Sequence, residues 1–286
     1  MLFVIGLIVV ISSILGGYVM HDGQLALLWQ PSEFVIICGA AFGSFLITNP
    51  IDIIKATGKQ LKYLFKTKPY TKKNYLELLI FLFTIFKLVK TKGMLALETH
   101  IEDPNSSDIF QQFPEITKDH HILSFVRDAL RLLIMGVDNY FHMEELIDKE
   151  LEVHSENANN PSHALITVGE SLPAFGIVAA VLGVINTMRS ISSPPQILGM
   201  LIAGALVGTF IGVLLAYGVI LPMGNFLHQY HEAEHKYLQC IKAGIIAHMQ
   251  GNAPAVTVEF VRKLIPPLER PSFHEVENAL NERSNI

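Results

Sequence analysis

The chain has 286 residues, half of them hydrophobic, and its mean hydropathy is positive. This composition is typical of a membrane protein that crosses the bilayer several times and keeps a substantial part outside it. The net charge of −5 argues against nucleic acid as the main partner. The two cysteines, Cys38 and Cys240, are far apart in the sequence and imply no disulfide framework.

Residues 1–50 predict a hairpin of two membrane-spanning helices. Leu2 to Met20 is uncharged and long enough to cross a bilayer. A secretory signal normally begins with positive charge and has a shorter apolar core, so we interpret this run as an uncleaved span. The second apolar run, Phe34 to Thr48, carries Gly39 and Gly43 four residues apart, a spacing that favours close helix packing. A short polar connection, His21 to Ser32, joins the two runs, and Glu33 leads into the second.

Residues 51–165 predict a helical domain in the cytoplasm. Ile51 to Lys73 contains seven lysines and one Asp, and an excess of basic residues marks cytoplasmic loops. Leu78 to Val89 is apolar but too short to cross a bilayer, which favours a buried or interfacial helix. Ile122 to Met135 interleaves apolar and charged residues, as amphipathic helices do. The six acidic residues within Phe141 to Glu156 favour a solvated helix face, with a docking surface as the alternative.

Residues 166–223 predict a second hairpin, made of membrane-spanning helices 3 and 4. No Asp, Glu, Lys or Arg lies between Glu170 and Arg189, or between Arg189 and Glu232, so each side is long enough to span. Small residues at helical spacing let backbones approach closely, so these helices are expected to pack against protein. The expected packing positions are Gly176, Gly183, Gly204, Gly208 and Gly212.

The two apolar runs of the second hairpin, on either side of Arg189 and after Glu170, lack any ionisable group that could relay a proton. A pump or proton-coupled transporter usually carries a carboxylate or histidine chain inside the membrane. The hairpin therefore predicts one wall of an ion path whose titrating group another chain supplies. The alternative is a plain helix-packing surface.

Residues 224–286 predict a cytoplasmic tail. Basic residues are concentrated in residues 51–165 and after Pro222, so both termini are expected in the cytoplasm. The four segments together predict an all-α membrane protein with four transmembrane helices and a large cytoplasmic helical domain.

The tail contains a pattern that favours a different function. Residues 231–235 read HEAEH, which on a helix places His231 and His235 on one face with spacing suited to zinc, as in metallopeptidases. The chain has 12 histidines, so a chance match is easy, and no third-ligand motif follows. Histidines at this end of a span also favour the negative end of the helix dipole. We therefore expect no metal site and keep a membrane zinc metallopeptidase as an alternative.

Several long stretches resemble the MotA flagellar stator subunits of the MotA/TolQ/ExbB proton channel family. These are GESLPAFGIVAAVLGVINTM, AGALVGTFIGVLLAYGVILP, AVTVEFVRKL with the later ERPSF, and LWQPSEFVII near the start. The resemblance implies a pentamer of this chain around a MotB dimer in the bacterial inner membrane. MotB would supply the proton-binding Asp, and ion flow would drive torque on the rotor protein FliG. The resemblance implies neither enzymatic activity nor a cofactor.

The resemblance also implies roles for individual residues on the ion path. The two functional prolines of the family fall on Pro173 and Pro222, and its pore-facing threonine falls on Thr209. Proline breaks the backbone ladder of a helix and allows a kink, although ordinary helix termination would also explain Pro222. Ala180 matches a position where sodium-driven members tend to carry a hydroxyl. Its lack of oxygen favours protons.

Three charged residues are implied at the rotor. Lys90 and Glu98 match a rotor-facing Arg and Glu of the family, with Lys90 keeping the charge but not the bidentate geometry of Arg. Glu150 matches an acidic position of less certain role. A TolQ/ExbB-like energy transducer is a further alternative, which the N-terminal hairpin argues against because those proteins usually have three spans.

Overall fold

The computed structural model describes residues 2–66, 69–104 and 106–284, and these form helices without any strand. Four helices are long and apolar enough to cross a membrane: Leu2–Met20, Leu25–Thr48, Tyr140–Met188 and Pro195–Met249. The predicted all-α fold with four membrane-spanning helices and a large helical domain is confirmed. The chain divides into two compact units, Met1–Thr67 with Asn157–Tyr230 and Lys68–Glu156 with His231–Ile286. The four predicted segments remain a prediction about which parts lie in the membrane.

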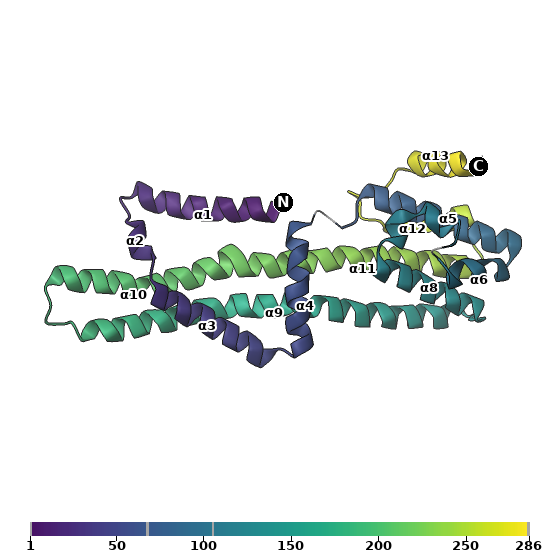
Figure 1. The fold of residues 1–286 in the computed structure, drawn as a ribbon. Helices are drawn as coiled ribbons and strands as arrows, with labels where there is room; N and C mark the ends of the chain where they lie inside the picture. Colours follow the sequence, from purple (N-terminus) through teal and green to yellow (C-terminus); the bar gives the residue numbers. More distant parts are fainter. Residues whose placement is uncertain (1, 67–68, 105, 285–286) are drawn as a thin grey trace. The chain divides into compact units, whose positions relative to one another are not determined.

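The first unit contains the helices nearest the N-terminus and the apolar parts of two long helices (Figure 1). Its core joins Ile37 and Ala41 to Ala179, Val207 and Ile211. Its elements are α1 (Leu2–Met20), α2 (Leu25–Leu28), α3 (Pro31–Thr48), α4 (Ile51–Gln60), the 3₁₀ helix η1 (Leu61–Phe65), the later part of α9 (Tyr140–Met188), α10 (Pro195–Leu215), the π-helix η3 (Ala216–Ile220) and the start of α11 (Leu221–Met249).

The second span begins earlier than its apolar run predicts. α3 starts at Pro31 rather than Phe34. Proline is favoured in the first turn because its missing N–H would have no helical partner there and its φ is already suited to a helix. Glu33 is consequently part of the helix and is buried, with 6% of its surface exposed.

The second unit is a helical domain with a large hydrophobic core. α5 begins after a capping box formed by Thr71 and Asn74 and ends at Gly93, where φ is +83°. The run predicted from Leu78 to Val89 lies inside it, with residues 78–82, 85 and 86 buried, so its buried interpretation is correct. The elements are α5 (Lys72–Lys92), α6 (Leu95–Glu102), η2 (Phe110–Gln112), α7 (Pro114–Thr117), α8 (His120–Ile134), the first part of α9, the later part of α11, α12 (Pro254–Leu264) and α13 (Phe273–Ser284).

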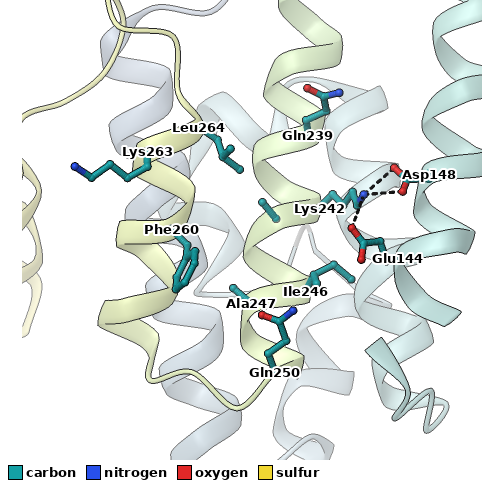
Figure 2. Close-up of a pocket in the computed structure, with 11 residues that line it drawn as sticks. Glu144, Asp148, Gln239, Lys242, Ile246, Ala247, Gln250, Phe260, Lys263 and Leu264 are labelled. Atoms are coloured by element: carbon teal, nitrogen blue, oxygen red, sulfur yellow. Dashed lines mark hydrogen bonds and ion pairs between the residues drawn. The ribbon is translucent and has the colours of Figure 1, made fainter. Parts of the chain in front are cut away.

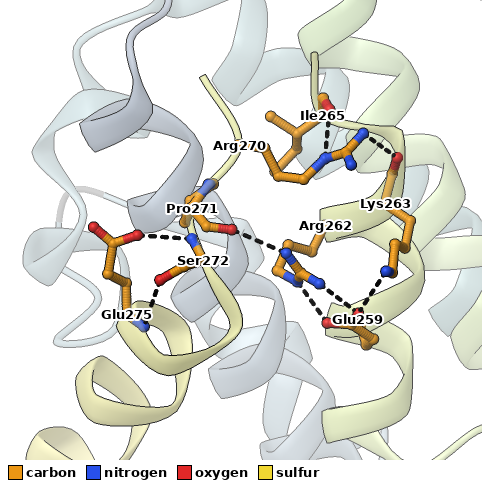
Figure 3. Close-up of polar contacts among 8 residues, drawn as sticks. All are labelled: Glu259, Arg262, Lys263, Ile265, Arg270, Pro271, Ser272 and Glu275. Carbon is orange, nitrogen blue, oxygen red and sulfur yellow. Dashed lines mark hydrogen bonds and ion pairs between the residues drawn. The ribbon is translucent and has the colours of Figure 1, made fainter. Parts of the chain in front are cut away.

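Two arginines fasten the chain that follows α12 (Figure 3). Arg270 donates to the carbonyl oxygens of Ile265 (3.0 Å) and Lys263 (2.9 Å), which lie at the end of α12. Arg262 is buried, forms a bidentate pair with Glu259 (2.6 and 2.7 Å) and donates to the Pro271 carbonyl (3.1 Å). The Arg270 guanidinium of the ERPSF stretch thus satisfies two carbonyl groups at the end of α12 at once.

Candidate functional site

α9 and α10 touch backbone to backbone in the first unit. A Cβ added at Gly212 would lie 2.7 Å from the Leu172 carbonyl oxygen, and one added at Gly176 would lie 2.8 Å from the Gly208 carbonyl oxygen. A Cβ at Gly183 would lie 2.7 Å from the Ala205 Cβ. The backbone cannot move aside as a flexible side chain can, so this contact requires glycine.

Gly204 and Gly208 face α3 and the segment before it. A Cβ added at Gly208 would lie 2.6 Å from Oε2 of Glu33, and one at Gly204 would lie 3.2 Å from the Gln30 amide nitrogen. Four of the five predicted packing glycines thus lie at the α9–α10 contact, and Gly204 lies beside it.

The two predicted prolines interrupt their helices at the same level of the hairpin. Pro173 lies inside α9 and cannot donate to the Gly169 carbonyl, while Pro222 follows η3 and cannot donate to the Gly218 carbonyl. A Cβ added at Gly169 would lie 3.2 Å from the backbone nitrogen of Leu221, so the two interrupted turns adjoin. A π-turn is wider than an α-turn, so η3 leaves space between the Pro222 ring and the Gly218 carbonyl. Single π-turns inside helices often mark functional sites.

Thr209 and Ala180 flank the glycine contact. Both are partly exposed. The Thr209 Cα is 3.3 Å from the Cβ position of Gly176, and the Ala180 nitrogen is 3.1 Å from that of Gly208. Thr187 donates its hydroxyl to the Gly183 carbonyl at 2.8 Å. Within the described part of the chain the Thr209 hydroxyl makes no such bond, so it is available to another molecule.

Glu33 is a site residue that sequence reasoning missed. The apolar parts of α9 and α10 carry no titrating group, as predicted, but α3 places a carboxyl against their glycine contact. Oε2 is buried and has no hydrogen-bond partner within the described residues, and Oε1 is 3.6 Å from the Cβ position of Gly183. The available signal was a single carboxylate immediately before an apolar run, which length alone assigns to the connection.

The predicted rotor residues lie in the second unit. Lys90 and Glu98 are exposed on either side of the turn at Gly93. Lys90 also acts on His248, whose pKa is lowered first by burial and then by the Lys90 charge. Glu150 is exposed on α9, and partial desolvation of its carboxyl, followed by the charge of Asp128, raises its pKa. Lys90 on α5 and Glu98 on α6 therefore flank the same turn. Glu150 lies on α9, and its charged neighbour Asp128 lies on α8.

A pocket of about 460 Å³ opens between α9, α11 and α12 in the second unit (Figure 2). Lys242 lies in it and contacts both Asp148 (2.7 Å) and Glu144 (3.1 Å). Burial alone would lower the pKa of Lys242, but hydrogen bonds to the two carboxylates raise it overall. Both carboxylates that line the pocket are paired with Lys242, so we interpret this cluster as a structural link between α9 and α11 rather than as a ligand site.

Two family models match the chain. Residues 4–93 match the motility protein A N-terminal model, and residues 117–240 match the MotA/TolQ/ExbB proton channel family. Motility protein A of Escherichia coli is 46% identical over 277 residues, covering 97% of this chain and 94% of that protein. The chemotaxis protein LafT of Vibrio parahaemolyticus is 34% identical and covers 98% of each chain. The chain belongs to the MotA family. The resemblance stated from the sequence is confirmed.

Solved structures support the fold of this MotA-family chain. The structure of C. jejuni MotAB aligns with a TM-score of 0.77 at 22% identity, covering 95% of this chain and 98% of that one. The flagellar MotAB stator complex from Bacillus subtilis aligns with a TM-score of 0.76 at 23% identity, covering 96% and 98%. Membership of the family makes the chain a stator subunit of the bacterial flagellar motor, located in the inner membrane. The family is one of stator and proton-channel subunits.

In the HEAEH pattern of this MotA-family chain, each histidine contacts a neighbouring side chain through one ring nitrogen. His231 Nδ1 lies 3.4 Å from Glu234, and the His235 Nε2 lies 2.9 Å from the Gln239 amide. Glu234 also lies 3.8 Å from His154 Nε2. Across the described residues no three His, Cys, Asp or Glu side chains are grouped to hold a metal ion. The geometry therefore gives no support to the metallopeptidase alternative, and the full-length motility relatives favour a stator over a TolQ/ExbB-like transducer.

Proposed function

We propose that this stator subunit assembles as a pentamer around a MotB dimer and conducts protons through the boundary between them. The related solved structures are described as MotAB complexes, which supports MotB as the partner. The observation that carries the proposal is the unengaged Thr209 hydroxyl beside a backbone-tight hairpin with two adjoining proline breaks. Such a wall can sense the protonation state of a partner carboxyl without carrying the titrating group itself.

Torque follows from a change of hydrogen bonding at Thr209. A MotB carboxylate accepts a hydrogen bond from that hydroxyl, whereas the protonated acid can donate one. The turns at Pro173 and Pro222 lack ladder bonds and bend more easily than the turns around them. A small change in hydrogen bonding is thus converted into movement at the interrupted turns. No covalent chemistry is involved, so the chain is not an enzyme and needs no cofactor.

The proposed ion is the proton. A sodium ion that loses water needs several oxygen ligands, and Ala180 supplies none, whereas a proton can pass along water and hydroxyl groups. The exposed Lys90 and Glu98 are proposed to contact FliG, with Glu150 as a further acidic contact. Both termini and the second unit lie in the cytoplasm, which the seven lysines of Ile51 to Lys73 support.

The proposal is tested by mass analysis of the complex purified in detergent from its native host. We expect several copies of this chain together with a smaller single-span protein that carries an intramembrane Asp. A chain that purifies alone with stoichiometric zinc would contradict the stator assembly and restore His231 and His235 as ligands. Copurification with a partner that lacks an acidic residue in its span would contradict the proposal that the partner supplies the titrating carboxyl.

A further inference from the structure

α4 and η1 present a line of exposed lysines that no part of the ion path uses. Lys55, Lys59 and Lys62 are exposed and follow one another at intervals of four and three residues, which places them on one helix face. Ile51 and Phe65 extend the same line and are 63% and 69% exposed. We call these five residues the basic stripe. It has positive charge in the middle and an exposed apolar side chain at each end.

The opposite face of α4 and η1 is fixed to the first unit. Leu64 is buried with Leu165 and Leu227. Tyr63 stacks on Tyr230 with ring centroids 4.6 Å apart, and the Gln60 amide donates to the Ala158 carbonyl at 3.3 Å. These partners lie on both α9 and α11, so α4 runs across the two long helices (Figure 1). Because its inner face is held, the basic stripe is directed outward.

The crossing lies where the apolar sequence of the two long helices gives way to polar sequence. The apolar sequence of the last span ends near Met223, and polar side chains at Asn159, Asn160, His228 and Gln229 flank the contacts of α4. α4 itself begins three residues after α3 ends. A helix that starts at the end of a span and lies across other spans at their polar limit lies in the interface plane.

We propose that the basic stripe binds the headgroups of anionic phospholipids and inserts Ile51 and Phe65 at the boundary with the acyl chains. Lysines beside a membrane are attracted to anionic lipid, and apolar residues in line with them add burial. A merely solvated basic face would leave Phe65 in water without compensation. The one acidic residue of α4, Asp52, lies in the first turn, where the helix dipole favours it. The proposal rests on the placement of the chain in the membrane and goes beyond torque generation.

The test is lipid binding by the complete stator complex. The complex is delipidated in detergent, and native mass spectrometry measures its binding of POPG and POPC at several salt concentrations. We expect wild type to prefer POPG, with a preference that weakens as salt rises. The variant Lys55→Gln/Lys59→Gln/Lys62→Gln should lose about a hundredfold of its POPG affinity, with POPC binding unchanged, since each lysine near an anionic surface contributes roughly fivefold.

Matched variants separate this site from general electrostatics. Lys73→Gln/Lys118→Gln/Lys236→Gln removes three exposed charges from the second unit and should keep the POPG preference. Changing Lys55, Lys59 and Lys62 to Arg should keep it too. The proposal is overturned if the stripe variant binds POPG as tightly as wild type does, or if the second-unit variant loses as much POPG affinity as the stripe variant. It is also overturned if inorganic phosphate at the same concentration as POPG displaces the lipid. None of these results would alter the stator assignment, which the copurification experiment tests.

Discussion

Single glycines determine how closely α9 and α10 approach. Gly212 faces the backbone of Leu172 and Gly176, and Gly183 faces Ala205, so the contact leaves no space for a side chain. Gly199 lies on the same helix and has nothing within 4 Å of its Cβ position. The requirement for glycine is therefore local to the contact and is not a property of α10 as a whole.

This difference predicts unequal effects of the same substitution. Gly212→Ala should destabilise the hairpin by about 1–3 kcal/mol, because the added methyl group would overlap the Leu172 carbonyl. Gly199→Ala should be neutral or slightly stabilising, because Ala is the better helix former. Thermal unfolding of the purified complex measures both. Equal melting temperatures for the two variants would show that the helices do not touch at Gly212.

Spacing in the sequence identified the small residues of this contact, whereas Glu33 could not be found in the same way. The glycines recur at helical intervals, and that recurrence is a property of the sequence alone. The position of Glu33 depends on where α3 starts and on which helices it packs against, and an apolar run defines neither. Its carboxyl belongs to the site only because α3 lies on α10.

At the scale of helices, the two long helices of the hairpin are interrupted by prolines at adjoining turns. α9 contains two prolines, Pro161 and Pro173, but only Pro173 adjoins the turn interrupted at Pro222, through Gly169 and Leu221. Proline at either position is evident from the sequence. The π-helix before Pro222 is not, because its shifted hydrogen bonds depend on how the helix packs.

Replacing these prolines separates function from folding. Pro173→Ala should restore the missing ladder bond, leave membrane insertion and assembly intact, and abolish torque because the turn no longer bends. Pro161→Ala restores a bond in the same helix away from Pro222 and should leave torque near wild type. Rotation of tethered cells measures the effect. Normal rotation with Pro173→Ala, or equal loss with both variants, would contradict the proposed role of the adjoining breaks.

The contact between α9 and α11 in the second unit depends on protons. His154 of α9 and His231 of α11 share the buried carboxylate of Glu234, with His121 and His235 nearby. Burial lowers the pKa of His154 despite the Glu234 charge. Burial of Glu234 acts to raise its pKa, but the His231 hydrogen bond and the His154 charge lower it overall. Both groups therefore bind protons less readily when folded than when unfolded.

Acidification should consequently loosen this contact. The contribution of His154 is lost as pH falls below its usual value of 6.5, and that of Glu234 as pH falls below 4.5, because the unfolded chain takes up these protons first. Amide hydrogen exchange in residues 231–238 should rise between pH 7 and pH 5.5, after correction for the intrinsic rate. His154→Gln should reduce this rise, and His274→Gln, at an exposed position, should not. Exchange independent of pH in wild type would contradict the coupling.

At the scale of the whole molecule, one chain supplies two compact units by passing three times between them. The sequence predicted segment limits at 165 and 223 from the ends of apolar runs, whereas contacts divide the chain after Glu156 and Tyr230. The two kinds of limit differ because α9 and α11 continue past the apolar sequence without a break. Hydropathy describes what can enter a membrane, and packing describes what folds together.

Exchanging exposed charges on the second unit tests whether this unit contacts the rotor. Lys90→Glu combined with Glu98→Lys keeps the net charge and changes two exposed side chains, so stability should stay within about 0.5 kcal/mol. Swimming speed should nevertheless fall strongly, because a rotor surface of fixed charge pattern would meet the reversed pattern. Lys118→Glu with Glu277→Lys makes the same exchange at other exposed positions and should swim normally. Loss of assembly in the first variant would assign Lys90 and Glu98 a structural role, and normal swimming would place the rotor surface elsewhere on this unit.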